Sequence, residues 1–296
     1  MFQVLAECIL RGVASSGSLT EKSATEFCSG DQPALSLWKN PKSMKRRVFV
    51  TGGAHGIGKG IVEAFARQGD EVVFCDLDPV LGTQTAAETG AQFCQLDVTD
   101  AVSLERCMRE LFDTWGDIDI LVNNAGLMKR IPMIEMSHTD FMRVIDVHVG
   151  GAFNCSKAVL PDMMEKREGK IINICSMMSE LGRETVSAYA AAKGALKMLT
   201  KNIASEYGEY NIQCNGMGPG YIATAQTAPL REVQPDGSRH PFDQFITAKT
   251  PAGRWGEPDD MVGPCVFLAS HASDFVNGQI LYADGGILAY IGRQPK

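Results

Sequence analysis

The sequence predicts a doubly wound α/β fold, in which helices cover both faces of a seven-stranded parallel sheet. Two observations indicate this fold class. Short apolar runs alternate along the chain with longer segments whose apolar residues recur at helical spacing. A glycine-rich turn at residues 52–58 joins the first apolar run to the first helical segment, where a parallel strand would pass into its crossover helix.

Each predicted element follows from its periodicity. The predicted strands are the apolar runs at residues 47–51, 71–76, 91–95, 118–123, 170–176, 212–217 and 279–283. Helical periodicity is clearest at residues 59–67, 102–115, 140–166, 188–207 and 258–269. Because strands and helices alternate, the strands are expected to run parallel, with their carboxyl ends at one edge of the sheet. Ligands of such sheets bind in the crevice outside that edge.

The glycine-rich turn directly follows the first predicted strand and has the order Gly52-Gly53-Ala54-His55-Gly56-Ile57-Gly58. Glycine lets the backbone approach a ligand closely, and the N-terminus of the following helix offers free N–H groups and a positive dipole end. Both features suit the pyrophosphate of a dinucleotide. The spacing is G-x-x-x-G-x-G, and the alternative interpretation is a surface turn without a ligand. The strand before the turn and the helix after it favour the dinucleotide site.

Asp76 ends the second predicted strand, where an acidic side chain of a dinucleotide site meets the adenosine ribose. A carboxylate accepts hydrogen bonds from the ribose hydroxyls and repels a 2′-phosphate. Neither the next residue, Leu77, nor His55 of the turn is lysine or arginine, so the sequence predicts NAD as the cofactor. NADP stays open, because a protonated His55 would pair with a phosphate. The alternative for Asp76 is a polar strand end without a ligand.

Tyr189 and Lys193 stand four residues apart in a segment of helical periodicity, so their side chains lie on one helix face. Ser176 ends the fifth predicted strand. A nearby ammonium favours the phenolate and would bring the tyrosine pKa of about 10 toward neutrality. Such a tyrosine donates and accepts protons, while a serine hydroxyl polarises the reacting oxygen. The alternative is a tyrosine and a lysine exposed on a helix surface.

Six motifs in a shared order resemble those of the short-chain dehydrogenase/reductase family over roughly residues 44–286. They are Thr51-Gly52-x-x-x-Gly56-Ile57-Gly58, Asp97-Val98, Asn123-Asn124-Ala125-Gly126, Ser176, Tyr189-x-x-x-Lys193 and Pro219-Gly220-x-Ile222-x-Thr224. The resemblance implies a Rossmann fold and hydride transfer between nicotinamide C4 and a carbinol or carbonyl carbon. It also implies that Tyr189 exchanges the hydroxyl proton, Lys193 lowers the tyrosine pKa and binds the nicotinamide ribose, and Ser176 binds the substrate oxygen.

The same resemblance implies which residues hold the dinucleotide, with Asp97 expected near the adenine. These residues are Gly52, His55, Gly56, Ile57, Gly58, Asp76, Asp97, Val98, Asn124, Ala125, Gly126, Tyr189, Lys193, Pro219, Gly220, Ile222 and Thr224. One catalytic position departs from the family, which commonly has an Asn that supports a water in a proton relay to the lysine. Here His148 stands in that place. An imidazole that donates and accepts would preserve the relay, and a satisfied core histidine is the alternative.

Three parts of the chain are similar to the branch of the family that contains gluconate 5-dehydrogenases and related keto-sugar-acid dehydrogenases. They are residues 171–185, residues 227–231 with 236–242, and residues 285–292. The likeness implies a hydride transfer between NAD(P) and D-gluconate or 5-keto-D-gluconate. The alternatives are another keto-sugar acid such as a 2-keto-3-deoxy acid, an apolar alcohol such as a hydroxysteroid, and a dinucleotide-binding protein without turnover. The complete Ser176, Tyr189 and Lys193 set argues against the last of these.

A sugar acid needs a cation for its carboxylate and polar groups for its hydroxyls. Arg130, shortly after the Asn123-Asn124-Ala125-Gly126 motif, is the first candidate for the carboxylate, and Arg183 is the second. Ser176 and Tyr189 are expected to contact the reacting oxygen. Further candidate cations are Lys129, Arg231 and Arg239. For each cation the alternative is a solvated surface charge.

Composition bounds the partners of this chain. The net charge of −7 argues against a nucleic acid or an anionic membrane, and no apolar run is long enough to predict a membrane span. Nine cysteines without C-x-x-C spacing indicate reduced thiols of a cytoplasmic protein, most of them small core residues, and no metal site is expected.

The domain organisation follows from the same patterns. Residues 1–43 are expected to be a weakly ordered extension, with a helix that packs on a neighbouring subunit as the alternative. Residues 44–296 are expected to form one Rossmann-type catalytic domain, whose proline-rich part at 221–255 is a lid over the substrate or, alternatively, an ordered insertion without a role. The resemblance implies a homotetramer, in which helices 140–166 and 188–207 meet their copies through apolar residues such as Leu196 and Ile203.

Overall fold

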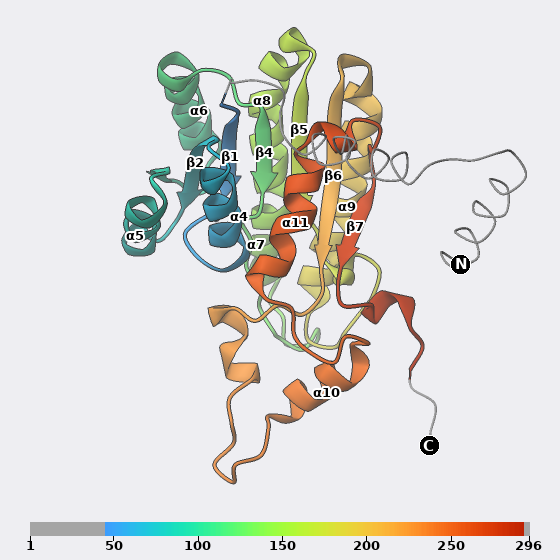
Figure 1. Ribbon diagram of the computed structural model, residues 1–296. Helices are drawn as coiled ribbons and strands as arrows, with labels where there is room; N and C mark the ends of the chain where they lie inside the picture. Colours follow the sequence, from blue (N-terminus) through green and yellow to red (C-terminus); the bar gives the residue numbers. More distant parts are fainter. Residues whose placement is uncertain (1–44, 293–296) are drawn as a thin grey trace, which may run out of the picture. The chain divides into compact units, whose positions relative to one another are not determined.

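A single parallel sheet of seven strands organises the protein, as the sequence predicts (Figure 1). The structure is a computed structural model that describes residues 45–292. The expected extension at residues 1–43 therefore lies outside the described residues and stays a prediction. The strand order is β3-β2-β1-β4-β5-β6-β7, and every neighbouring pair is parallel. The strands are β1 Arg47–Thr51, β2 Glu71–Asp76, β3 Gln92–Gln95, β4 Ile120–Asn123, β5 Gly169–Ile174, β6 Ile212–Pro219 and β7 Ile280–Ala283.

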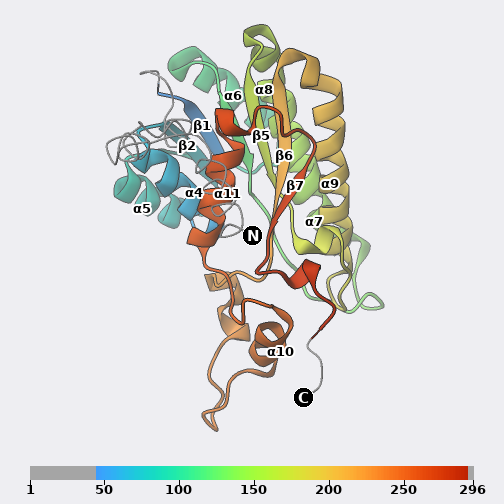
Figure 2. The ribbon, with the colours of Figure 1, turned by 45° about the vertical axis from the view of Figure 1, so that its right-hand side comes forward.

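Helices cover both faces of this sheet (Figures 1 and 2). The α-helices are α4 Gly56–Arg67, α5 Pro79–Thr89, α6 Ala101–Trp115, α7 His138–Ile145, α8 Gly151–Lys166, α9 Ser187–Tyr207, α10 Pro241–Lys249 and α11 Pro258–Leu268. Shorter segments are the π-helix η1 Asp146–Gly150 and the 3₁₀ segments η2 Met177–Ser179, η3 Gly208–Tyr210, η4 Ala225–Leu230, η5 His271–Ser273 and η6 Ile287–Ala289. The predicted helix at 140–166 is thus divided, because η1 separates α7 from α8.

The core consists of two apolar layers, one on each face of the sheet. Val48 and Val50 of β1 pack toward α4 and α11, whereas Phe49 between them packs toward α6 and α8. Successive side chains of a strand point to opposite faces, so a strand covered on both sides is apolar throughout. This is why the central strands appear in the sequence as continuous apolar runs.

The chain changes direction across the sheet between β1 and β4, and this change creates the crevice for a ligand. From β1 the chain adds β2 and β3 on one side, and it then returns to place β4 on the other side of β1. The connections after β1 and β4 therefore diverge above the carboxyl edge of the sheet. Open α/β sheets bind ligands at such a point.

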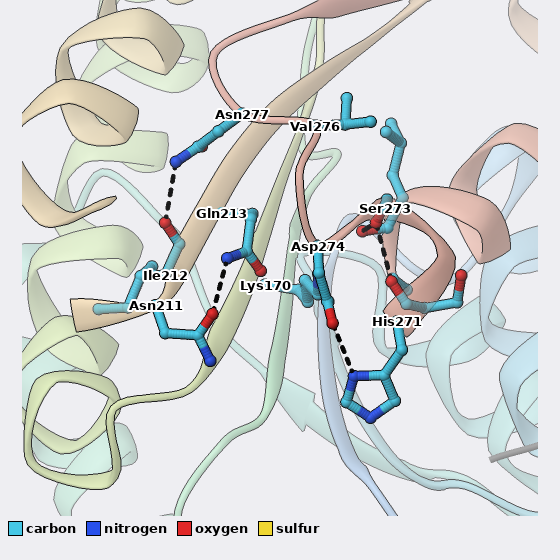
Figure 3. A network of polar contacts seen from close by, with 12 residues as sticks. Lys170, Asn211, Ile212, Gln213, His271, Ser273, Asp274, Val276 and Asn277 are labelled. Atoms are coloured by element: carbon cyan, nitrogen blue, oxygen red, sulfur yellow. Dashed lines mark hydrogen bonds and ion pairs between the residues drawn. The ribbon is translucent and has the colours of Figure 1, made fainter. Parts of the chain in front are cut away.

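The opposite edge of the sheet is held by a polar network that joins the connection after α11 to β6 (Figure 3). The Asn277 amide oxygen accepts a hydrogen bond from the Cys214 N–H at 2.8 Å, and its amide nitrogen donates to the Ile212 carbonyl at 3.2 Å. Nearby, the largely buried Lys170 ammonium pairs with Asp274 at 2.6 Å. The pairing of β6 with β7 begins only at Gly216, and the Asn277 side chain supplies hydrogen bonds to β6 before that residue.

The expected lid at residues 221–255 extends beyond the carboxyl edge of the sheet (Figure 2). It is more regular than its proline content indicates, since it contains η4 and the nine-residue helix α10. Tyr221, Phe242 and Trp255 pack ring against ring at its base, with centroids 5.6 to 6.3 Å apart. Asp243 links the base further, because it accepts from the Trp255 indole N–H and from Arg239, both at 2.7 Å. Among the described helices, none has the length and hydropathy that a membrane crossing requires.

We predict that Asn277→Ala lowers the free energy of unfolding by about 2–3 kcal/mol, because the Cys214 N–H and the Ile212 carbonyl lose their partner. Urea denaturation at a fixed protein concentration measures this change. The control is Asn202→Ala, since the exposed Asn202 amide donates to Glu206 on the surface of α9 and its loss should cost less than about 0.5 kcal/mol. Equal effects of the two substitutions would show that the network does not hold the sheet edge.

Candidate active site

A cavity of about 730 Å³ lies at the carboxyl edge of the sheet. The structure brings together in its lining every residue that the sequence analysis proposed for catalysis, for the dinucleotide and as first or second choice for the substrate carboxylate. These are Gly52, His55, Gly56, Ile57, Gly58, Asp76, Asp97, Val98, Asn124, Ala125, Gly126, Arg130, His148, Ser176, Arg183, Tyr189, Lys193, Pro219, Gly220, Ile222 and Thr224. Their residue-by-residue roles stay proposals.

The turn between β1 and α4 forms the part of the lining that suits a pyrophosphate. Gly52 and Gly56 have positive φ angles of 66° and 58°, which glycine adopts without strain. A Cβ atom at Gly52 would lie 2.9 Å from Ala125 Cα, and one at Gly58 would collide with the Gly52 carbonyl oxygen. Within the described chain α4 has no side-chain cap and no acid in its first turn, so its N–H groups are available to an anion.

Thr51 and Asn124 fasten this turn to the neighbouring strand. The Thr51 hydroxyl oxygen accepts hydrogen bonds from the N–H groups of Asn124 and Ala125, each at 3.0 Å. In return the Asn124 side-chain amide donates to the carbonyls of Thr51 and Gly52, at 3.0 and 2.8 Å. Asn124 therefore sets the position of the glycine turn from within the cavity wall.

The Asp76 carboxylate lies at the end of β2, beside the same turn. Its oxygens accept hydrogen bonds from the Ala54 N–H at 3.0 Å and the Asp78 N–H at 3.2 Å. A carboxylate has about four lone-pair positions, so it keeps acceptors for a ligand hydroxyl. The neighbouring Leu77 and His55 are both exposed. The arrangement is as expected for a carboxylate that meets a ribose, and the preference for NAD over NADP stays a prediction.

Loops after β3 and β6 supply two further walls. Asp97 follows β3, and its carboxylate accepts from the N–H and the hydroxyl of Thr99, at 2.9 and 2.7 Å. Gly220 follows β6, and a Cβ there would lie 2.7 Å from Asp284 Cα. Thr224 begins η4, where its N–H donates to the Thr227 hydroxyl at 2.9 Å. These bonds hold the chain in tight turns, so that backbone as well as side chains line the cavity.

Ser176, Tyr189 and Lys193 meet in this cavity from two elements. Ser176 caps η2, where its hydroxyl oxygen accepts from the Met178 N–H at 3.1 Å. Tyr189 and Lys193 project from successive turns of α9, and the Lys193 Nζ lies 5.5 Å from the centroid of the tyrosine ring. The Lys193 ammonium, buried to 3% exposure, donates to the Ile174 carbonyl at 2.5 Å.

Burial dominates the pKa values of both α9 residues. It lowers the pKa of Lys193 from 10.5 to about 8 and raises the pKa of Tyr189 above its ordinary value, although the neighbouring Ser176 hydroxyl acts in the lowering direction. In the protein without ligands, burial sets the direction of the Tyr189 shift, and the expected lowering of its pKa by Lys193 stays a prediction. Tyr189 is therefore a protonated phenol at neutral pH.

His148 lies in the π-helical segment η1, a local widening of the helix that is frequent at functional sites. The ring is buried and 5.3 Å from the ring of Tyr189, in an edge-on contact. Its Nε2 is 2.8 Å from the Leu127 carbonyl, whereas its Nδ1 has no hydrogen-bond partner among the described residues. Burial and the charge of Lys193 lower its pKa to about 3, so the ring is neutral. In the tautomer that donates from Nε2 to this carbonyl, Nδ1 is an acceptor, whereas in the other tautomer Nε2 accepts from the Leu127 N–H at 3.3 Å and Nδ1 carries the hydrogen.

Arg130 and Arg183 line the cavity together. The Arg183 guanidinium lies over the ring of Phe242, 5.1 Å from its centroid, and donates to the Tyr221 hydroxyl at 3.2 Å. Burial and the neighbouring charge of Arg183 lower the pKa of Arg130. Neither arginine forms an ion pair with a carboxylate of residues 45–292. Two close guanidinium groups without a counter-charge favour an anionic ligand.

The other candidate cations are engaged elsewhere. Lys129 pairs with Asp140. Arg231 donates to the Thr224 carbonyl at 3.0 Å, and Arg239 pairs with Asp243 at 2.7 Å. Both of these arginines line a separate open hollow on the lid, not the cavity. They are thus placed to stabilise the lid.

The structure also adds residues that the sequence analysis did not single out. Tyr221 lines the cavity and joins its hydroxyl to Arg183, and its position directly after Pro219-Gly220 was the available signal. Met177, Met178 and Val186 form a buried apolar cluster with Met128 beside Tyr189. One wall of the reacting centre is therefore apolar, which no local pattern indicated.

Comparison with known proteins gives relatives over most of the chain. The family model described as enoyl-(acyl carrier protein) reductase, one of the short-chain dehydrogenase models, matches residues 52–288. The chain is 46% identical over 251 residues to 2-dehydro-3-deoxy-D-gluconate 5-dehydrogenase of Formosa agariphila. The aligned region covers 83% of this chain and 93% of the relative.

Two solved structures are similar in sequence and in fold. The 2-keto-3-deoxy-D-gluconate dehydrogenase from Streptococcus agalactiae is 58% identical, with a TM-score of 0.74 over 88% of this chain and 100% of that one. The gluconate 5-dehydrogenase from Burkholderia cenocepacia J2315, solved in complex with NADP and tartrate, is 37% identical, with a TM-score of 0.79 over 87% of this chain and 100% of that one. With its glycine turn, its Ser176, Tyr189 and Lys193, and these relatives, the chain belongs to the short-chain dehydrogenase/reductase family.

Proposed function

We propose that this protein is an NAD(P)-dependent dehydrogenase that interconverts a secondary alcohol and a ketone at C5 of a six-carbon sugar acid. The observation that carries the proposal is the pair Arg130 and Arg183, two guanidinium groups without a carboxylate partner in the described chain, in the cavity that holds Ser176 and Tyr189. Such a cavity would bind a substrate that has an anionic group at one end and a reacting oxygen at the other.

Two substrate pairs fit this description. D-gluconate with 5-keto-D-gluconate is the first, and it agrees with the relative from Burkholderia cenocepacia. A 2-keto-3-deoxy acid is the second, and the 58% identical relative from Streptococcus agalactiae favours it. The apolar wall of Met177, Met178 and Val186 also favours a substrate with a methylene group, which loses no hydrogen bond there.

The residues present fit a dinucleotide. The glycine turn and the uncapped N-terminus of α4 would hold the pyrophosphate, and Asp76 would hold the adenosine ribose. When bound, NAD(P) supplies the group that accepts or donates the hydride. A relative was solved with NADP, and in this chain the Asp76 carboxylate supports a preference for NAD.

In the mechanism that we propose, Ser176 holds the substrate oxygen and Tyr189 carries its proton. The protonated phenol of Tyr189 is the form that donates a proton to a ketone oxygen as it becomes an alcohol. Lys193, whose pKa is about 8, has its Nζ 5.5 Å from the centroid of the phenol ring and is the group that would return the proton. We propose that His148 carries its hydrogen on Nε2 and that its Nδ1 accepts a hydrogen bond from a water next to Lys193, which the absence of a partner for Nδ1 among the described residues supports.

We also propose a homotetramer and a cytoplasmic location. Phe153 on α8 and Met198 on α9 are 51% and 60% exposed, and such apolar side chains suit an interface between copies. Leu196 and Ile203, which the sequence analysis placed at that interface, are instead buried within the subunit. Light scattering at micromolar concentration tests the assembly, and a monomer would exclude it. The cytoplasmic location rests on the free thiols of the described cysteines.

The function is tested by turnover of the purified protein with NAD and with NADP against D-gluconate, a 2-keto-3-deoxy sugar acid, neutral hexitols and a hydroxysteroid. We expect turnover of one of the sugar acids and a higher kcat/KM with NAD. Equal turnover of neutral hexitols would contradict the sugar-acid assignment. A tenfold preference for NADP would contradict the role of Asp76.

We predict that Tyr189→Phe lowers kcat by at least about 100-fold, because only the proton-carrying hydroxyl is removed. The dinucleotide Kd, measured by fluorescence titration, should stay within about twofold of the wild type. Tyr210→Phe on η3, far from the cavity lining, is the matched control and should keep wild-type kcat. Retention of more than a few per cent of kcat by the Tyr189 variant would mean that another group moves the proton.

We predict that His148→Leu lowers kcat by about 10- to 100-fold, while His148→Asn recovers most of the loss. The reason is that an amide, like the neutral imidazole, donates to the Leu127 carbonyl and still offers an acceptor. The measurement is kcat with KM and thermal unfolding for both variants. If leucine and asparagine lower kcat equally, or if only the unfolding temperature falls, His148 is a core residue and not part of a relay.

We predict that Arg130→Ala and Arg183→Ala each lower kcat/KM for the sugar acid by about 10- to 150-fold, because a charge-assisted hydrogen bond to the carboxylate is lost. The loss should be absent for a neutral alcohol of the same length. Arg254→Ala is the control, since Arg254 pairs with Asp260 outside the cavity. Wild-type kcat/KM in both cavity variants would place the carboxylate elsewhere.

A further inference from the structure

Two half-buried thiols meet at the edge of the sheet, outside the lining of the cavity. Cys94 on β3 and Cys107 on α6 bring their Sγ atoms to 3.0 Å, a hydrogen-bonding contact between thiols. β3 is an edge strand, so this pair lies where solvent reaches the sheet. The other five cysteines of the described residues are buried.

The segment between the two cysteines forms part of the cavity wall. Residues 96–100 connect β3 to α6, and within them Leu96, Asp97, Val98 and Thr99 line the cavity. Asp97 is the residue that the family resemblance places near the adenine. A covalent bond between Cys94 and Cys107 would close a loop whose tip is this wall. The thiol pair is therefore joined through this short connection to the part of the cavity where we propose that the dinucleotide binds.

The two thiols are also chemically different. The hydrogen bond with Cys107 lowers the pKa of Cys94 to about 7, although the nearby charge of Glu110 and partial burial act in the raising direction. The same contact raises the pKa of Cys107. Cys75 lies opposite Cys94 in the register of β2 and β3, but complete burial raises its pKa well above the ordinary value. The contact thus favours the thiolate form of one cysteine with the thiol of the other beside it, as in redox-responsive cysteine pairs.

We propose that Cys94 and Cys107 form a redox-active thiol pair, which peroxides oxidise to a disulfide that shifts the 96–100 wall and weakens dinucleotide binding. The two sulfur atoms must approach from contact to bonding distance, and in our proposal β3 or α6 moves as they do. The short connection between them transmits that movement to Leu96 through Thr99.

The chemistry balances in two steps. The Cys94 thiolate attacks one oxygen of a hydroperoxide: an S–O bond forms, the O–O bond breaks, and the leaving oxygen takes up a proton as water or an alcohol. The Cys107 sulfur then attacks the Cys94 sulfenic sulfur, the S–O bond breaks, and the hydroxide leaves with the Cys107 proton as water. The two thiols lose two electrons in total, and the peroxide gains them.

Peptide mapping tests the cross-link in the full-length protein. The reduced protein is treated with hydrogen peroxide, its remaining thiols are alkylated, and it is cut after glutamate. This cleavage separates the cysteines, since Cys94 falls in fragment 89–105 and Cys107 in fragment 106–110. We expect the two fragments joined, lighter by two hydrogens than their sum, and separated again by dithiothreitol. Absence of this joined pair, or a cross-link of Cys94 to Cys75 instead, overturns the proposal.

Dinucleotide binding supplies the second measurement. We expect the Kd for the dinucleotide to rise by about fivefold or more in the oxidised protein and to return on reduction. Cys107→Ser should abolish both the cross-link and the change in Kd, whereas Cys265→Ser, a buried cysteine of α11, should behave as the wild type. An unchanged Kd in the cross-linked protein overturns the coupling to the cavity.

The binding measurement depends on the proposed function, while the cross-link does not. Failure of the reduced protein to bind either dinucleotide would count against the proposed function, and the joined fragments would still decide on the thiol pair. If Cys107→Ser folds poorly, the wild type alone tests the proposal, because oxidation and reduction of its own thiols form and break the disulfide without a substitution. Thermal unfolding of each variant identifies that case.

Discussion

The junction between the carboxyl ends of β1 and β4 is the constraint on which the site depends. Four hydrogen bonds join Thr51 and Gly52 at the end of β1 to Asn124 and Ala125 after β4. They hold the Gly52 turn so close to Ala125 that no side chain fits at Gly52. The segment that follows stays equally close to its neighbours, because a Cβ at Gly126 would overlap the His148 ring. His148 in turn contacts the ring of Tyr189. One continuous series of contacts thus joins the proposed pyrophosphate turn to the proposed proton carrier.

Removal of water from this crevice sets its electrostatics. Burial makes Lys193 easier to deprotonate, keeps Tyr189 protonated and keeps His148 neutral. The shifts have a common cause, because a medium with little water disfavours the charged form of each group. The proposed ligands would change this balance, since both the dinucleotide and a sugar acid are anions. The cavity therefore offers cationic groups to anionic ligands, although the chain as a whole has a net charge of −7.

The lid contributes by holding one cation in place. Arg183 comes from the segment after η2, yet the groups around its guanidinium are Tyr221 and Phe242, from the base of the lid and from α10. Trp255 packs against both rings, and its indole N–H donates to Asp243. Contact with the aromatic faces holds the guanidinium in place, and apart from the hydrogen bond to the Tyr221 hydroxyl these rings take none of its donors. The Arg183 side chain would thereby link the position of the proposed lid to the proposed binding of the substrate carboxylate.

Local patterns in the sequence determined the fold class and the order of the strands along the chain, and together with the family resemblance they predicted many of the residues that line the cavity, from Gly52 to Thr224. They succeeded because strand periodicity and glycine spacing report local geometry, and because parallel strands necessarily end at one edge. Tertiary structure alone decided which cations face the cavity. The sequence around Arg183 and Arg239 does not show that Arg239 is paired with Asp243. It also decided the direction of the Tyr189 pKa shift, the lack of a partner for His148 Nδ1 among residues 45–292, and the contact of Cys94 with Cys107. Each of these depends on burial and on partners distant along the chain, which no short segment encodes.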